Sequence, residues 1–177
     1  MLNPEGKLIF EYVLVPWGRD AVALAFDPEV FPQIGRIYLP GREQRNFLKT
    51  ADKAMKIPPA AELVRAYLAG ERVRFAATEL DLREFTPFRR AVSLAAIRIP
   101  YGQTRSYGEL AAVARTPRAA RAVGRVMATN PLPLVIPCHR VLAADGGLHG
   151  FGGGLPMKAR LLELEGVRLA SGRRALL

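Results

Sequence analysis

The hydrophobic pattern of the first half of the chain predicts a mixed α/β unit. Two apolar runs, KLIFEYVLV at 7–15 and DAVALAF at 20–26, are typical of strands. The segment AELVRAYLAGE at 61–71 spaces its apolar residues as a helix does. We therefore expect strands and at least one helix in this half.

The pattern changes in the second half, where helical periodicity begins at SYGELAAVA (106–114). Ser106 followed by Glu109 three residues later is a capping-box signature, in which each side chain bonds the other residue's backbone N–H. The apolar side of this predicted helix is formed by Leu110, Ala111, Val113 and Ala114.

A second helix is predicted in RTPRAARAVGRVMATN (115–130), with Thr116 as its N-cap and Pro117 at its first position. At 100° per residue, Arg118, Arg121 and Arg125 share one face. The packing face is formed by Ala119, Val123, Val126 and Met127. Two helices with a short turn and a basic outer face indicate a helix-turn-helix that binds DNA, with an ordinary hairpin and a solvated arginine face as the alternative. Small residues such as Ala122 would allow close approach to the nucleic-acid backbone.

The only cysteine, Cys138, directly precedes one of the two histidines, His139. The preceding PLPLVIP is apolar and predicted to be extended, because the prolines disfavour helix. In a continuing strand, neighbouring side chains point to opposite faces. A working pair therefore requires a turn at this point or a bridging water. The alternative is that Cys138 is a small buried hydrophobe.

The segment LPMKARLLELEG (155–166) predicts a helix that ends at Gly166. On a helical wheel Glu165 lies in the middle of the apolar stripe, while Glu163 points away. A carboxylate in an apolar stripe needs a buried hydrogen-bond donor, which His139 could supply. The carboxylate would in turn fix the tautomer of the imidazole. The alternative is that Glu165 reaches solvent at the helix end.

Composition narrows the function further. Residues 1–85 carry 12 basic and 12 acidic side chains, whereas residues 86–177 carry 14 basic and 4 acidic ones, so the net charge of +10 belongs to the second half. This asymmetry favours a polyanionic partner, nucleic acid before a membrane surface. One cysteine excludes an internal disulfide, and one Cys with two His makes structural zinc improbable. Glu11 interrupts the N-terminal apolar run, and no run is long enough to span a bilayer, so we expect an intracellular, cytoplasmic protein.

The block from Thr86 to Gly166 closely resembles the O6-alkylguanine-DNA alkyltransferases, the methylated-DNA–protein-cysteine methyltransferase family. The resemblance is carried by TPFRRAVSLAAIRIPYGQTRSYGELA, PRAARAVGRVMATNP, and NP followed by IPCHRV and GGGLPMKARLLELEG. It implies an α+β chain with two domains. Residues 1–82 would form a mixed α/β, ribonuclease H-like domain. Residues 86–177 would form a mainly helical DNA-binding and alkyl-acceptor domain with the helix-turn-helix.

The resemblance also implies roles for individual residues. Cys138 would accept the alkyl group, His139 would deprotonate it through a water, and Glu165 would orient His139. Asn130 would tie the helix-turn-helix to the active-site segment. Arg121 would fill the gap left by the flipped base, and Tyr107 would help rotate that base. The remaining expected DNA contacts are Ser106, Arg118, Ala122 and Arg125, and the expected base pocket comprises Val141, Phe151, Gly152 and Gly153.

The activity that follows is direct DNA repair. The alkyl group of O6-alkylguanine, and of O4-alkylthymine, in double-stranded DNA would move irreversibly to Cys138, once per molecule, with no cofactor and no metal. We expect a monomer, and cooperative binding on DNA stays open. Phe151 stands where many members have tyrosine and Gly152 where others have Ser or Ala, which leaves the tolerated alkyl size open. We expect His149 to be a surface residue. The main alternative is a non-catalytic sensor of alkyl lesions, against which Cys138 argues; a transcription regulator and a thiol hydrolase fit less well.

Overall fold

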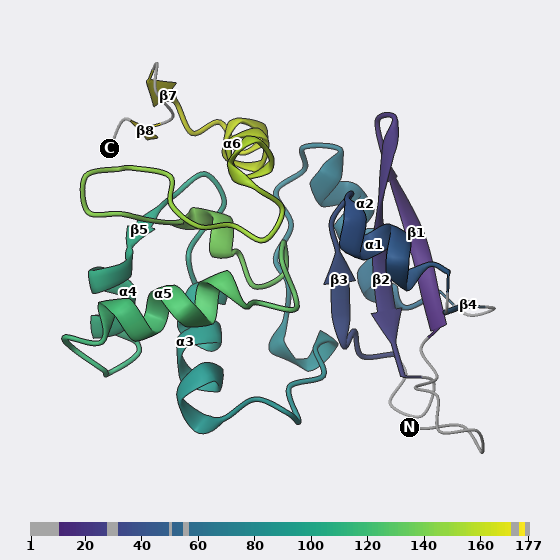
Figure 1. Cartoon of the computed structure of the whole chain (residues 1–177), viewed down its shortest axis with the longest axis horizontal. Coiled ribbons are helices and arrows are strands. Elements are labelled where there is room, and N and C mark those ends of the chain that lie inside the picture. Colours follow the sequence, from purple (N-terminus) through teal and green to yellow (C-terminus); the bar gives the residue numbers. More distant parts are fainter. Residues whose placement is uncertain (1–10, 28–31, 50, 55–56, 171–173, 176–177) are drawn as a thin grey trace. The chain divides into compact units, whose positions relative to one another are not determined.

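The computed structural model describes residues 11–27, 32–49, 51–54, 57–170 and 174–175 of the chain. It divides into two compact units, residues 1–83 and 84–177, each of which is described by itself (Figure 1). The first four residues of the strand predicted at 7–15 lie outside the described residues. The predicted combination of a mixed α/β half and a mainly helical half is confirmed.

The first unit is built on a four-stranded sheet with the order β3-β2-β1-β4. β1 and β2 form an antiparallel hairpin in which Trp17 pairs with Asp20, and Gly18 takes a positive φ of 63° in the two-residue turn. In β1 the buried positions alternate with exposed ones, whereas β2 is buried continuously from Val22 to Phe26. α2 packs against β1. The elements are β1 Glu11–Trp17, β2 Asp20–Phe26, β3 Arg36–Tyr38, α1 Arg42–Phe47, β4 Asp52–Lys53, α2 Pro59–Leu68 and a 3-10 turn at Ala77–Glu79.

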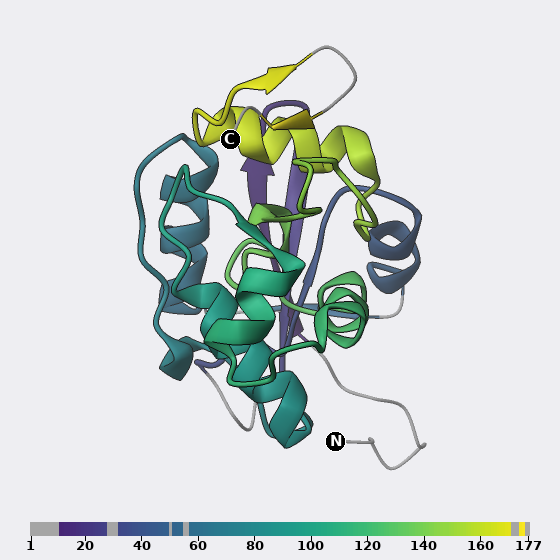
Figure 2. The same cartoon turned by 90° about the vertical axis from the view of Figure 1, so that its left-hand side faces the viewer.

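The second unit packs helices α3, α4 and α5 against one another around the buried residues Val92, Leu110, Val123 and Met127. β5 pairs in parallel with β6, and β7 pairs antiparallel with β8. Both views place the segment that carries Cys138 between α6 and the α4–α5 pair (Figures 1 and 2). The elements are α3 Pro87–Ile97, β5 Arg105–Ser106, α4 Tyr107–Val113, α5 Ala120–Ala128, a 3-10 helix at Cys138–Arg140, β6 Val141–Leu142, α6 Leu155–Leu164, β7 Leu169–Ala170 and β8 Arg174–Ala175.

The two ends of the predicted helix-turn-helix behave differently. The capping box is confirmed: Ser106 Oγ accepts from Glu109 N at 3.1 Å, and Glu109 Oε2 accepts from Ser106 N at 2.7 Å. The predicted start of the second helix at Thr116 and Pro117 is wrong, because α5 begins at Ala120. Thr116 instead closes the turn, since its N and Oγ1 both donate to Ala111 O, at 2.9 and 3.2 Å. Pro117 suits a turn as well as a first helical turn, so its signal was ambiguous.

None of the helices among the described residues is both long and apolar enough to cross a bilayer.

Candidate active site around Cys138 and the basic surface

The segment before Cys138 is not the extended run that the sequence predicted. Residues 131–137 form bends and turns, and Ile136 N donates to Leu132 O at 2.9 Å. Leu134 takes a left-handed φ of 74° although its side chain is buried. Proline at both 131 and 133 excludes helix but fits turns as well as strands, so the apolar pattern alone could not separate the two.

The chain then turns through the 3-10 helix Cys138–Arg140, closed by Arg140 N donating to Pro137 O at 2.9 Å. Successive side chains of a 3-10 helix diverge by about 120°. Cys138, His139 and Arg140 therefore point in three directions from one turn, and all three are buried. This is the turn that a working pair of Cys138 and His139 requires.

Glu165 meets His139, as the wheel of the last helix predicted. It follows the last residue of α6 as its C-cap, and its Oε1 lies 2.8 Å from His139 Nε2, with both side chains fully buried. Glu163 is exposed. The alternative in which Glu165 reaches solvent is therefore wrong. With Nε2 directed at Glu165, Nδ1 is the ring nitrogen left to exchange a proton.

Arg140 is a second partner of Glu165 that sequence reasoning missed. Its Nε donates to both carboxylate oxygens at 3.1 and 2.9 Å, its second terminal nitrogen donates to Oε1 at 2.9 Å, and its first donates to Ile99 O at 2.6 Å. Gly102 N adds a bond to Oε2 at 3.0 Å, and a Cβ on Gly102 would stand 2.8 Å from Glu165 O. A glycine is therefore required where the backbone closes over the carboxylate.

These contacts set the protonation of the cluster. Burial alone would raise the pKa of Glu165, but the hydrogen bonds and charges of His139 and Arg140 outweigh it and lower that pKa to about 2. Burial lowers the pKa of His139, and the cations Arg140 and Lys158 lower it further against the pull of Glu165. Because Arg140 already neutralises the carboxylate, His139 stays neutral and can accept a proton.

Asn130 lies beside the sulfur. Its Nδ2 donates to Ile136 O at 2.8 Å and to Cys138 Sγ at 3.1 Å, while its Oδ1 accepts from Leu132 N at 3.0 Å. One amide therefore fixes the turn before Cys138 and contacts the sulfur that ends it. The Cys138 side chain is 5% exposed. Burial raises the pKa of the thiol, whereas the Asn130 bond and the Lys158 charge act in the opposite direction.

Lys158 on α6 is fully buried and was also missed by sequence reasoning. Its ammonium donates to Val141 O at 2.8 Å and to His149 O at 3.1 Å. Burial lowers its pKa to about 8, against the charge of Cys138, which raises it. A signal existed: Lys158 precedes Glu165 by seven residues, so the two share one face of the helix. Lysine is so often exposed that this spacing alone does not predict a buried ammonium.

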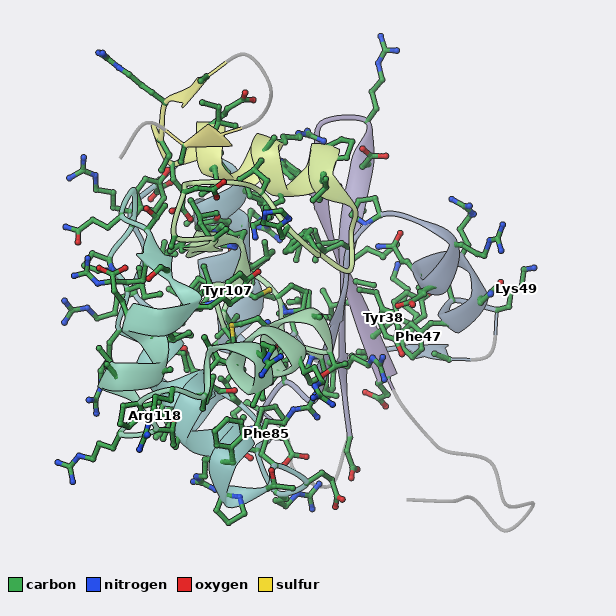
Figure 3. All side chains as sticks on the ribbon, turned by 60° about the vertical axis from the view of Figure 1, so that its left-hand side comes forward. Tyr38, Phe47, Lys49, Phe85, Tyr107 and Arg118 are labelled. Atoms are coloured by element: carbon green, nitrogen blue, oxygen red, sulfur yellow. The ribbon has the colours of Figure 1, made fainter. Side chains whose placement is uncertain are left out.

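Tyr107 and the loop after β6 lie near the same group. Tyr107 is half-buried at the start of α4, and its hydroxyl donates to His149 O at 3.4 Å (Figure 3). Burial raises the pKa of Tyr107, and the charge of Cys138 raises it further. The His149 side chain is exposed. Of the expected base pocket, Val141 is buried in β6, Phe151 is half-buried, and Gly152 and Gly153 are exposed in the loop before α6.

A pocket of about 550 Å³ opens elsewhere, beside β5 and the start of α4. Neither Cys138 nor the expected base pocket lines it; its lining residues are Gln103, Thr104, Arg105, Ser106, Glu109, Leu142, Ala143 and Ala144. Among the described residues, no group of three or more His, Cys, Asp or Glu is arranged to hold a metal ion.

The expected DNA-contact residues fall into two sets. Arg121 and Arg125 are exposed on α5, and Ala122 is half-buried beside them. Arg118 is exposed but lies in the turn before α5 with a φ of 72°, so it does not share a helical face with the other two arginines as predicted. Ser106 is the half-buried N-cap of α4.

Known proteins match this architecture. The family model described as 6-O-methylguanine DNA methyltransferase, DNA binding domain, matches residues 87–167. A methylated-DNA–protein-cysteine methyltransferase of Mycobacterium bovis is 50% identical over 109 residues, which cover 62% of this chain and 65% of that protein. The match thus spans just under two thirds of the mycobacterial relative.

Two further matches cover more of the chain. A methylated-DNA–protein-cysteine methyltransferase of Methanosarcina acetivorans is 40% identical over 149 residues, which cover 75% of this chain and 93% of that protein. The crystal structure of Mycobacterium tuberculosis OGT in complex with DNA has a TM-score of 0.70 at 37% identity and covers 90% of this chain and 93% of that one. The chain therefore belongs to the methylated-DNA–protein-cysteine methyltransferase family.

Proposed function

We propose that this chain repairs alkylated DNA directly, by moving the alkyl group of O6-alkylguanine, and of O4-alkylthymine, in double-stranded DNA irreversibly to Cys138. The observation that carries the proposal is the buried row Glu165–His139 next to Cys138, with Asn130 donating to the sulfur. Family membership and the similarity to a protein solved with DNA support the partner and the reaction.

The first step is activation of the thiol. Neutral His139 would take the Cys138 proton at Nδ1, directly or through a water, while Glu165 stabilises the imidazolium through Nε2. Arg140 fixes Glu165 in place, so the imidazole holds one orientation. The Lys158 ammonium and the Asn130 amide would then stabilise the negative sulfur, which burial otherwise disfavours.

The second step is displacement. The thiolate attacks the alkyl carbon, forming the S–C bond as the C–O6 bond breaks, and the bonding pair leaves with the guanine. Guanine regains a proton at its ring nitrogen, so the proton lost by Cys138 is balanced by the one gained at the base. The Tyr107 hydroxyl, held near this site, would donate a hydrogen bond to the leaving base. The thioether on Cys138 has no route back to a thiol, and the scheme needs no cofactor.

The lesion must leave the base stack before it can reach a buried sulfur. We propose that Arg121, exposed on α5, fills the vacated space, and that Ser106, Ala122 and Arg125 contact the duplex around it. The base would enter between Val141 and the loop with Phe151, Gly152 and Gly153. We further propose that one chain acts alone as a monomer, since every site residue comes from the second unit, and that it works where the chromosomal DNA lies. The ribonuclease H-like assignment of residues 1–82 stays part of this proposal.

Intact-protein mass spectrometry tests the reaction. The protein is mixed with a duplex that carries one O6-methylguanine, and then digested to locate any modification. The proposal predicts a mass gain equal to one methyl group in place of one hydrogen, located on Cys138 and absent from Cys138→Ser. Lesion binding without any gain in mass would instead identify a non-catalytic sensor.

A further inference from the structure

The turn between α4 and α5 holds two arginines in a backbone conformation that suits glycine. Arg115 has a φ of 58° and Arg118 a φ of 72°. Residues with a Cβ are disfavoured in this left-handed region because the Cβ crowds the following carbonyl. Among the described non-glycine residues, only Leu134 shares this conformation. Local folding alone would therefore favour glycine or asparagine at both positions.

The backbone of the turn and Thr116, and not the arginine side chains, make the hydrogen bonds that hold this conformation. Both arginines are exposed, and within the described part of the chain neither guanidinium makes a hydrogen bond or ion pair. Figure 3 shows Arg118 at the edge of its unit. Arg140, in contrast, makes bonds with all its nitrogens in the same unit. Exposed cations with no bond inside the described part of the chain point to an anionic partner outside it.

The turn itself is firmly held. Arg115 N donates to Ala112 O at 3.0 Å, Thr116 bonds Ala111 O through its backbone and its hydroxyl, and Ala119 N donates to Thr116 O at 3.1 Å. Pro117 restricts the backbone between the two arginines. The two cations are thus presented from a fixed frame, which reduces the entropy lost when they bind a ligand.

The charge around the turn is one-sided. Between residues 100 and 140 the sequence has a single acidic residue, Glu109, and its carboxylate already accepts from Ser106 N. Arg121 and Arg125 on the adjoining helix add positive charge. A planar guanidinium fits a phosphate through two parallel bonds, so the ligand chemistry that suits this turn is the phosphate backbone.

We propose that residues 115–118 form a phosphate clamp, in which Arg115 and Arg118 contact backbone phosphates of duplex DNA beside α5. The inference rests on the proposed function in that DNA is the partner. It adds Arg115 to the DNA contacts, and it gives Arg118 a role in the turn instead of on the helical face. Because phosphates carry no sequence or lesion information, the clamp strengthens binding to damaged and undamaged duplexes alike.

Replacing Arg115 by glycine tests strain and binding together. Arg115→Gly relieves the left-handed strain, so the melting temperature rises by about 2 °C or more. The same change removes one phosphate contact, so affinity for an undamaged duplex falls and the slope of log K against log salt becomes shallower by about 0.9. Arg118→Gly behaves likewise, whereas Arg115→Lys keeps both the charge and the slope. Thermal unfolding and fluorescence-anisotropy titrations at several NaCl concentrations measure these effects.

Arg168→Gly is the matched control, because Arg168 is exposed in the same unit and does not have a positive φ. It should leave the salt slope unchanged and should not raise the melting temperature. An unchanged slope in Arg115→Gly, or an equal loss of slope in Arg168→Gly, overturns the clamp.

The reaction of Cys138 with the free base O6-methylguanine, which needs no DNA contact, separates this test from the proposed function. If Arg115→Gly keeps the wild-type rate with the free base but has the shallower slope, the clamp is supported. If the salt slopes of the wild type and Arg115→Gly differ as predicted but Cys138 is never alkylated, the clamp stands and the repair reaction fails. If the wild type binds no duplex, the clamp is overturned.

Discussion

Arginine serves two opposite purposes within the second unit. Arg140 is buried, and its nitrogens are bonded to the Glu165 carboxylate and to a backbone carbonyl. Arg115, Arg118 and Arg121 are exposed, and the structure gives their guanidinium groups no partner among the described residues. The buried charges hold the turn that carries Cys138, whereas the exposed ones are available to something outside the protein. Substitutions should therefore affect folding and chemistry in one region and only binding in the other.

The largest effect is expected for Glu165→Gln. It leaves Arg140 buried without a countercharge, which costs about 3–5 kcal/mol of unfolding free energy, and it slows alkylation of Cys138 by roughly 100-fold or more. The pKa of Glu165 is about 2 in the folded chain and ordinarily 4.5. Its stabilisation is thus complete above pH 4.5 and is lost as the pH falls towards 2. Urea unfolding at pH 7 and pH 3 measures the loss of stability and its pH dependence, and intact-protein mass spectrometry over time measures the rate of alkylation.

Glu163→Gln, an exposed neighbour on the same helix, is the control for that measurement. It should change stability by less than about 0.5 kcal/mol. Equal stability of the two variants at pH 7 would contradict the contribution of the buried Glu165–Arg140 pair to the free energy of unfolding.

A smaller effect, of roughly 3 kcal/mol, is expected from the pH dependence of Lys158→Met. The pKa of Lys158 is about 8 when folded and ordinarily 10.5, so between these values the unfolded chain binds more protons and the wild type gains stability as pH rises. Below pH 8 the cost of burying the charge is fully present. Between pH 8 and 10.5 the unfolding free energy of the wild type should therefore rise relative to that of Lys158→Met. Denaturant unfolding across this range measures it.

The same variant also reports on the sulfur. Without the Lys158 charge, the thiol pKa rises, and the rate of Cys138 alkylation by iodoacetamide should reach its plateau at higher pH than in the wild type. Arg160→Met removes an exposed cation from the same helix and should give a flat stability difference. If the stability difference between the wild type and Lys158→Met also stayed constant with pH, the lowered pKa of a buried Lys158 would be contradicted.

Ser106→Ala should cost about 1 kcal/mol, because it removes one half of the capping box that starts α4. Glu109→Ala removes the other half, and the two bonds are reciprocal. The double variant should therefore cost less than the sum of the single ones, as measured by thermal unfolding. Strict additivity would mean that the two side chains act independently in solution.

The smallest effect on stability is expected on the exposed helical face. Arg125→Ala should alter unfolding by less than about 0.5 kcal/mol yet weaken duplex binding, with a salt slope shallower by about 0.9. Arg140→Ala should show the opposite pattern, with a large loss of unfolding free energy and an unchanged salt slope of duplex binding. A strong loss of stability in Arg125→Ala, measured alongside its duplex affinity, would erase the distinction between the two regions.

Sequence patterns located the parts of this unit that follow periodicity. The capping box and the burial of Glu165 could both be predicted, because spacing along a helix fixes which side chains share a face. Patterns could not place Arg118 in a left-handed turn, since Pro117 is equally suited to a turn and to the start of a helix. For a similar reason the sequence predicts an extended segment around Leu134 where the structure has turns, because proline excludes helix without selecting between turn and strand.

Arg140 and Lys158 show a different limit. Charged residues are ordinarily exposed, so the sequence alone offers no reason to bury two of them. Only the three-dimensional arrangement brings together the carboxylate and carbonyl oxygens that bond Arg140 and Lys158 and so make burial of these two cations acceptable. The partners of these two cations, Glu165 and the carbonyl oxygens, are the part of the site that depends most on tertiary structure.

The most direct test of the central claim is a stoichiometry measurement. A duplex with one O6-methylguanine is mixed in excess with a known amount of protein, and restored guanine is counted over time. The account predicts a plateau at one repaired guanine per active chain, with no further repair after longer incubation and none in Cys138→Ser. Continued turnover beyond one equivalent, or repair that survives loss of the sulfur, would contradict transfer to Cys138.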